Sequence, residues 1–115
     1  MINYDGRRFR PVLDEHAGDG RMAVYRQDGD LLWGEFRGGR ARRGALTGRC
    51  APDGSLEFTY CMVTDAGELI SGRCSSTPQI LADGRIRLDE VWERYGPNAS
   101  SGISCIEEIP TKETT

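Results

Sequence analysis

Short strand-like runs separated by closely spaced Asp-Gly turns constrain this 115-residue chain more than any other feature. An Asp-Gly pair between two alternating runs indicates a β-hairpin, because glycine readily adopts the positive φ that a tight hairpin turn requires. In the central part of the chain, residues 43–94, such turns lie at Asp53-Gly54, Asp65-Ala66-Gly67 and Asp83-Gly84. The pattern predicts a series of antiparallel hairpins.

The same rhythm continues outside the central part, and no window shows helical spacing with caps. We expect a polar loop at residues 14–20, a break of the strand pattern at Thr77-Pro78 and a flexible tail at residues 110–115. Residues 1–109 are predicted to form one all-β domain, an antiparallel up-and-down meander of about eight strands closed into a small barrel, since closure removes exposed edges. The expected strands are residues 1–5, 7–13, 21–27, 30–37, 43–50, 55–63, 68–74, 85–94 and 103–109.

Composition excludes several classes of partner. The net charge of −3 argues against a nucleic-acid-binding protein, and the arginines between residues 37 and 43 lie on a turn without interleaved aromatic residues, which is typical of a solvated loop. No apolar run approaches the length of a membrane span, and residues 1–8 contain no apolar signal segment. We therefore expect a cytoplasmic protein that binds neither nucleic acid nor membrane.

The residues that bind metals or perform covalent catalysis are sparse. The chain has one histidine, His16, and four cysteines at positions 50, 61, 74 and 105, with no Cys-x-x-Cys pair. These spacings do not supply a zinc site, and we expect reduced, structural thiols. No nucleophile has a histidine nearby in the sequence. The sequence predicts no metal, no cofactor and no catalytic residue.

Hairpin register assigns side chains to the two faces of the sheet, because a two-residue turn fixes the pairing and side chains alternate along a strand. Turns centred on residues 28/29, 38/39, 53/54, 66/67 and 83/84 place most charged side chains on one face, which should contact water. The opposite face combines apolar positions with polar and aromatic ones, and convergent polar groups with aromatic walls are typical of a small-ligand site. An excess of inward arginines favours an anionic ligand. The predicted ligand-binding residues are Tyr25, Thr47, Arg49, Tyr60, Ser71, Arg73, Ser75, Glu90, Trp92 and Arg94.

Two alternatives to this ligand cavity stay open. The interior could be filled by a polar network in which Arg94 pairs with Glu90, or the arginines could lie in solvent at the barrel mouths. A one-residue bulge would also reverse a strand and move its side chains to the other face.

A neutral patch interrupts the charged outer face in the same register. Uncharged patches on a charged surface are typical of subunit interfaces, so the pattern predicts a homodimer. In the alternative, the termini or the loop at residues 14–20 cover the patch. Its predicted residues are Leu46, Gly48, Cys50, Thr59, Cys61, Val63, Ile70, Gly72 and Cys74.

Three segments resemble a family of small bacterial proteins that are often labelled N-acetylglutamate synthase. They are residues 1–10 (MINYDGRRFR), 71–80 (SGRCSSTPQI) and 83–88 (DGRIRL), and the resemblance covers nearly the whole chain. The label implies an acetyltransferase that uses acetyl-CoA. Acetyltransferases of the usual kind bind the pyrophosphate of acetyl-CoA with an Arg/Gln-x-x-Gly-x-Gly/Ala motif at the start of a helix. The run most similar to this motif is residues 26–31 (RQDGDL), which has Leu31 at the last position and lies in a predicted hairpin turn.

A second resemblance is to avidin-like barrels. Residues 45–50 (ALTGRC), preceded by residues 32–36 (LWGEF), resemble the Leu-Thr-Gly strand rhythm of that family over about half of the chain. The resemblance implies an eight-stranded calycin-type meander, similar also to lipocalins, with a ligand in the barrel mouth. The biotin pocket of that family uses several tryptophans, whereas this chain has Trp92 and an outward Trp33, so we expect a ligand other than biotin.

Taken together, the sequence favours a non-catalytic β-barrel that binds a small anionic molecule in its interior and forms a homodimer. An acetyltransferase, as the label implies, and a structural protein with a filled barrel are the alternatives.

Overall fold

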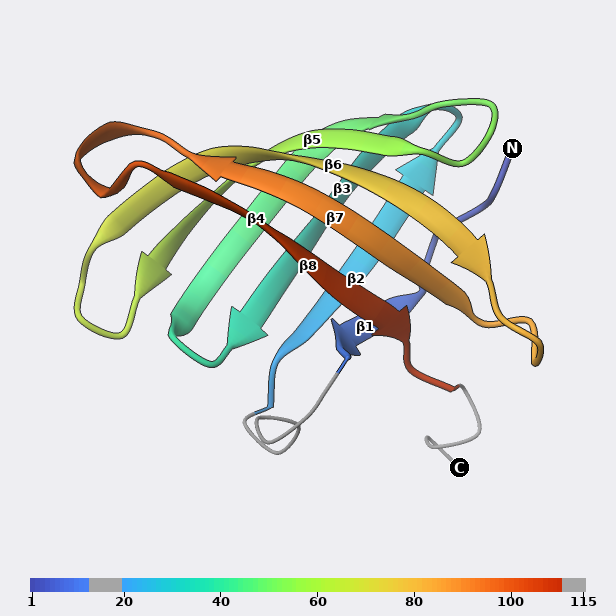
Figure 1. Ribbon diagram of the computed structural model, residues 1–115, viewed down its shortest axis with the longest axis horizontal. Coiled ribbons are helices and arrows are strands. Elements are labelled where there is room, and N and C mark those ends of the chain that lie inside the picture. Colours follow the sequence, from blue (N-terminus) through green and yellow to red (C-terminus); the bar gives the residue numbers. More distant parts are fainter. Residues whose placement is uncertain (13–19, 111–115) are drawn as a thin grey trace.

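Eight antiparallel strands form a closed barrel in the computed structural model, which describes residues 1–12 and 20–110 (Figure 1). Each strand pairs with the next one along the chain, and β1 pairs with β8 to close the barrel. The predicted all-β meander is therefore confirmed. The elements are β1 (Arg8–Pro11), β2 (Met22–Asp28), β3 (Leu31–Gly38), β4 (Ala41–Cys50), β5 (Leu56–Thr64), β6 (Leu69–Ile80), β7 (Ile86–Arg94), the 3-10 turn η1 (Gly96–Asn98) and β8 (Ser100–Glu108).

Two of the expected elements differ from the structure. Residues 1–5 form no strand, and β6 continues through Thr77 and Pro78 to Ile80. Pro78 is tolerated because β6 pairs with β5 only as far as Ser76, so the missing N–H of the proline lies on the side without a partner strand. The predicted loop at 14–20, the tail at 110–115 and His16 lie outside the described residues, apart from Gly20 and Pro110. In the described part of the chain no helix is long and apolar enough to cross a membrane.

The N-terminal segment closes one end of the barrel. Tyr4 is fully buried, its hydroxyl donates to the Gly54 carbonyl at 2.6 Å, and its ring lies 6.3 Å from the ring of Phe9 and 6.2 Å from that of Tyr25. The Tyr4 backbone N–H donates to the side-chain oxygen of Gln27 at 2.9 Å. Residues 1–5, predicted as a strand, thus act as a plug, because burial of the Tyr4 ring in the core stabilises the segment across the barrel end.

The hydrophobic core lies mainly in the half of the barrel next to this plug. Ile86 and Leu88 occupy the first inward positions of β7, and Leu32 and Leu56 lie near the starts of β3 and β5. The core consists of Tyr4, Phe9, Tyr25, Leu32, Leu46, Cys50, Leu56, Phe58, Cys74, Ile86 and Leu88.

The structure reverses the predicted faces of β4 and β6. The turns explain the error, since three of the hairpins are closed by loops of three residues rather than two. Ala51 N–H donates to Ser55 O before β5, Thr64 N–H donates to Glu68 O before β6, and Leu81 N–H donates to Arg85 O before β7. Gly54, Gly67 and Gly84 adopt φ values of +90°, +82° and +89° in these loops.

A loop with an odd number of residues turns the side chains of the following strand to the face opposite to the one that a two-residue turn would give. A register shift between Phe36 and Gly38 reverses β4 first, and the next loop restores β5. The loop after β5 then reverses β6, and the loop after β6 restores β7.

The reversal moves many of the predicted site and interface residues to the opposite face. Thr47, Arg49, Ser71, Arg73 and Ser75 lie on the outer face instead of the interior. Leu46, Gly48, Cys50, Ile70, Gly72 and Cys74 lie on the inner face instead of the predicted interface, while Thr59, Cys61 and Val63 remain outside.

Candidate functional site

A cavity of about 1050 Å³ occupies the half of the barrel that the plug does not fill. It opens between the β3–β4 turn, the β5–β6 turn and the η1 connection, which contribute Arg40, Glu68 and Pro97 to its lining. Its apolar wall includes Phe36, Leu46, Phe58, Tyr60, Met62, Ile70 and Trp92.

Strand β7 places three chemically different side chains along this cavity. Glu90, Trp92 and Arg94 alternate with outward residues, so all three project inward above the core residue Leu88. Successive inward residues of a strand are about 6.6 Å apart. The carboxylate is therefore deepest, the indole lies at mid-height and the guanidinium lies nearest the opening.

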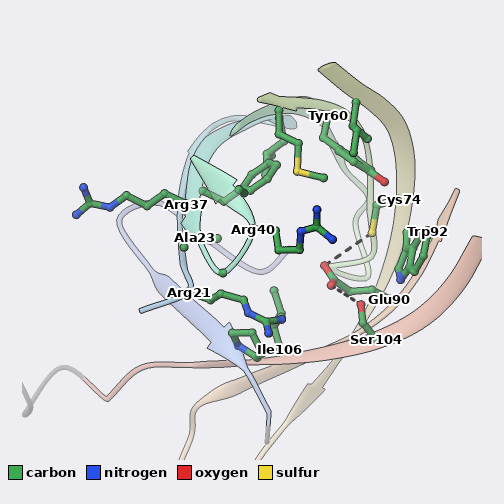
Figure 2. Close-up of a pocket in the computed structure, with 18 of the residues that line it drawn as sticks. Arg21, Ala23, Arg37, Arg40, Tyr60, Cys74, Glu90, Trp92, Ser104 and Ile106 are labelled. Carbon is green, nitrogen blue, oxygen red and sulfur yellow. Dashed lines mark hydrogen bonds between the residues drawn. The ribbon is translucent and has the colours of Figure 1, made fainter. Parts of the chain in front are cut away.

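Glu90 lies in a small polar cluster on the cavity wall. Its carboxylate accepts hydrogen bonds from Ser104 Oγ at 3.0 Å and from Cys74 Sγ at 3.7 Å (Figure 2). Burial raises the pKa of Glu90, and these hydrogen bonds offset part of the rise. Burial, together with the nearby Glu90, raises the pKa of the Cys74 thiol to about 12, so this cysteine is a neutral hydrogen-bond donor and not a nucleophile.

Arg94 holds an unsatisfied donor at the opposite end of this row. Its guanidinium carbon lies 5.3 Å from the centre of the Trp92 ring, in a cation–π contact. In the part of the chain that the structure describes, Arg94 Nε is buried and has no hydrogen-bond partner. Burial raises the pKa of Tyr60, and the neighbouring Arg94 guanidinium offsets part of that rise.

Further arginines border the opening. The residues that line the cavity include five arginines and two glutamates. Arg21 and Arg40 project toward the opening, whereas Arg37 points away from it (Figure 2). The Arg40 side chain is 77% exposed, with its Nε 3.7 Å from Asp65, so its charge is partly screened by solvent.

The structure brings together half of the predicted ligand-binding residues, namely Tyr25, Tyr60, Glu90, Trp92 and Arg94. The other predicted arginines form ion pairs on the outer face, where Arg49 lies 3.0 Å and Arg73 lies 3.8 Å from Glu57. Sequence reasoning missed several lining residues. The hairpin register predicts Leu46, Ile70 and Cys74 on the outer face, and the sequence predicts no role for Ser104, whereas all four line the cavity.

The described residues contain no cluster of three or more histidine, cysteine or acidic side chains that could hold a metal ion. All four cysteines are free thiols, with Cys50 and Cys74 buried and Cys61 exposed. The polar groups of the cavity therefore offer hydrogen bonds and charge, and no pair of them forms a nucleophile with its base.

The profile of the family described as Avidin-like protein matches residues 2–109. The chain belongs to the avidin-like family. No curated protein and no solved structure matches this avidin-like chain, so no relative supports the resemblance to proteins labelled N-acetylglutamate synthase. The match spans all eight strands and residues 2–5 of the plug, and the cavity occupies the open end of this avidin-like barrel.

Proposed function

We propose that this avidin-like barrel is a non-catalytic binding protein for a small organic anion, held in the cavity with its acidic group on Arg94. The observation that carries the proposal is Arg94, which lines the cavity and whose buried Nε has no hydrogen-bond partner among the described residues. A buried donor left unsatisfied destabilises a protein by about 1–3 kcal/mol. Because Arg94 lines the cavity, a bound carboxylate would bring an acceptor and an opposite charge to its guanidinium.

The geometry of Arg94 suits a carboxylate. A guanidinium presents a planar fork of donors that matches the two oxygens of a carboxylate, and the cation–π contact with Trp92 holds the Arg94 guanidinium beside the indole ring. Burial in the barrel strengthens such a charged hydrogen bond relative to water. The apolar wall beyond it would cover the rest of the ligand.

Thermal-shift and calorimetric titration of the purified protein with small carboxylates test this proposal. A ligand present at a hundred times its dissociation constant should stabilise the fold by about 2.7 kcal/mol. Arg94→Met should weaken binding at least about tenfold, because it keeps the apolar stem and removes the charge.

Arg73→Met is the matched control, because Arg73 lies on the outer face near Glu57. It should leave binding unchanged. The proposal is refuted if no carboxylate binds or if the two variants weaken binding equally.

We propose as a second candidate that the outer face of β4–β6 forms a homodimer contact. The supporting observation is a shallow groove lined by uncharged residues, next to the two ion pairs that Arg49 and Arg73 form with Glu57. Sedimentation of the wild type and of Thr59→Arg tests this candidate, and a monomeric wild type at high concentration would exclude it. The outward residues at the groove are Ala45, Thr47, Thr59, Cys61, Ser71 and Tyr95.

A further inference from the structure

Two of the aromatic rings in the cavity wall lie directly over glycines of the following strand. A methyl group added at Gly44 of β4 would collide with the ring of Phe36 on β3. A methyl group added at Gly102 of β8 would lie 2.7 Å from Cζ2 of Trp92 on β7. Both glycines face the barrel interior, and in each case the atoms that the methyl group meets first belong to the ring and not to the backbone.

Tyr60 repeats the arrangement on β5. A methyl group at Gly72 of β6 would lie 2.8 Å from the Tyr60 hydroxyl oxygen and would also collide with the backbone carbonyl of Glu93. Gly72 is the register partner of Arg94, so the Tyr60 hydroxyl extends across β6 toward that guanidinium. Strands β3, β5 and β7 thus each carry a ring that leans over a glycine of the next strand.

This arrangement decides how much of the barrel is open. A large side chain that projects straight inward fills a small barrel, whereas a ring laid over a glycine is held against the wall. Figure 2 shows Tyr60 and Trp92 beside the wall, with Arg40 and Glu90 between them and Arg21, and all five residues line the cavity.

We infer that Gly44, Gly72 and Gly102 set the width of the cavity, and that the site thereby selects organic anions with a flat, ring-sized apolar body over acyclic or inorganic ones. The inference rests on the proposed function, since it concerns the ligand that Arg94 would hold.

The balance of polar and apolar surface favours such a body. A cavity of about 1050 Å³ lies at the upper end of the range of pockets that enclose small organic molecules. Inorganic phosphate would occupy the guanidinium and leave the walls formed by Phe36, Met62 and Trp92 in contact with water. A flexible chain would lose conformational entropy on binding that a rigid ring does not lose.

Matched carboxylates test this inference on the intact protein. Calorimetry measures the affinity of the protein for phenylacetate, hexanoate, acetate and inorganic phosphate. The fluorescence of Trp92 is followed in a Trp33→Phe variant, because Trp33 lies on the outer face, is 39% exposed and would otherwise contribute to the signal. We expect phenylacetate to bind at least about tenfold more tightly than hexanoate and to quench the fluorescence of Trp92. Acetate and phosphate should bind more weakly than hexanoate.

Gly102→Ala provides the decisive comparison. The added methyl group should displace the Trp92 ring into the cavity, shift its emission and reduce the preference for phenylacetate over hexanoate to less than about threefold. Ser101→Ala, on the exposed outer face of the same strand, should change neither quantity. If Gly102→Ala does not fold, Gly44→Ala applies the same test through Phe36.

The outcomes separate the two proposals. Failure of every carboxylate to bind refutes the proposed function itself. Equal affinity for phenylacetate and hexanoate refutes the inference about cavity width but not the proposed function. The same holds if Gly102→Ala shifts the Trp92 emission and the variant still prefers phenylacetate.

Discussion

Replacement of Tyr4 measures how much of the stability comes from the plug. The ring is fully buried among Phe9 and Tyr25, and truncation of a buried aromatic side chain to alanine destabilises a protein by about 3–5 kcal/mol. Tyr4→Phe keeps the ring and removes the hydrogen bond to the Gly54 carbonyl, which leaves a buried acceptor unsatisfied at a cost of about 1–3 kcal/mol.

Urea denaturation of the two variants checks these values. Domains of this size are stable by about 5–15 kcal/mol, so loss of the ring would remove a large fraction of the total. Tyr95→Phe is the control, because Tyr95 is 44% exposed and the same change should alter stability by less than about 0.5 kcal/mol. If Tyr4→Ala costs less than about 1.5 kcal/mol, the N-terminal segment does not close the core and the reasoning fails.

Three further predictions concern ionisable groups and thiols. The raised pKa of Glu90 means that its contribution to stability is greatest below the pKa of the unfolded chain and is lost as the pH rises through the folded pKa. Glu90→Gln should therefore become more stable relative to wild type as the pH rises from 4 to 8 in urea titrations, and a constant difference would contradict this. Glu108→Gln should lower stability by about 1–3 kcal/mol, since the buried carboxylate accepts two hydrogen bonds from the partly exposed Arg7, and an unchanged unfolding midpoint would exclude that role. Maleimide labelling followed by mass spectrometry should modify the exposed Cys61 well before Cys74, which is buried and has a pKa of about 12, and the reverse order would show that the face of β6 is misassigned.

The sequence contains enough information for the order of the strands but not for the face of every strand. Asp-Gly pairs mark where hairpins turn, and Trp92 and Tyr60 follow from their alternation along β7 and β5. The number of residues in each turn is not encoded so clearly, because Gly54 supplies a positive φ equally to a two-residue or a three-residue loop.

Hydrophobic alternation would have corrected the two reversed strands. On β4 it places Leu46 inside and Arg49 outside, and on β6 it places Ile70 inside and Arg73 outside. Two unpaired inward arginines would cost far more free energy than two exposed apolar residues, so burial is the stronger constraint on register.

The plug and the glycines beneath the aromatic rings depend on contacts between distant segments. Tyr4 contacts Gly54, which lies 50 residues away, and no local pattern distinguishes a capping segment from a first strand. Gly102 occurs in a run of small polar residues that reads as a loop, and its role appears only when β8 lies beside Trp92.

Strand β7 runs from the core half of the barrel into the half that contains the cavity. Ile86 and Leu88 are buried in the core, while Glu90 and Arg94 carry polar groups whose burial costs free energy. Because the plug encloses the core at one end, the open end can hold those groups without collapse of the whole barrel. Tyr4→Ala should therefore lower stability far more than Arg94→Met, and Arg94→Met should weaken anion binding far more than it lowers stability. If Tyr4→Ala or Arg94→Met reduced stability and anion affinity by similar amounts of free energy, the core and the cavity would not be energetically independent.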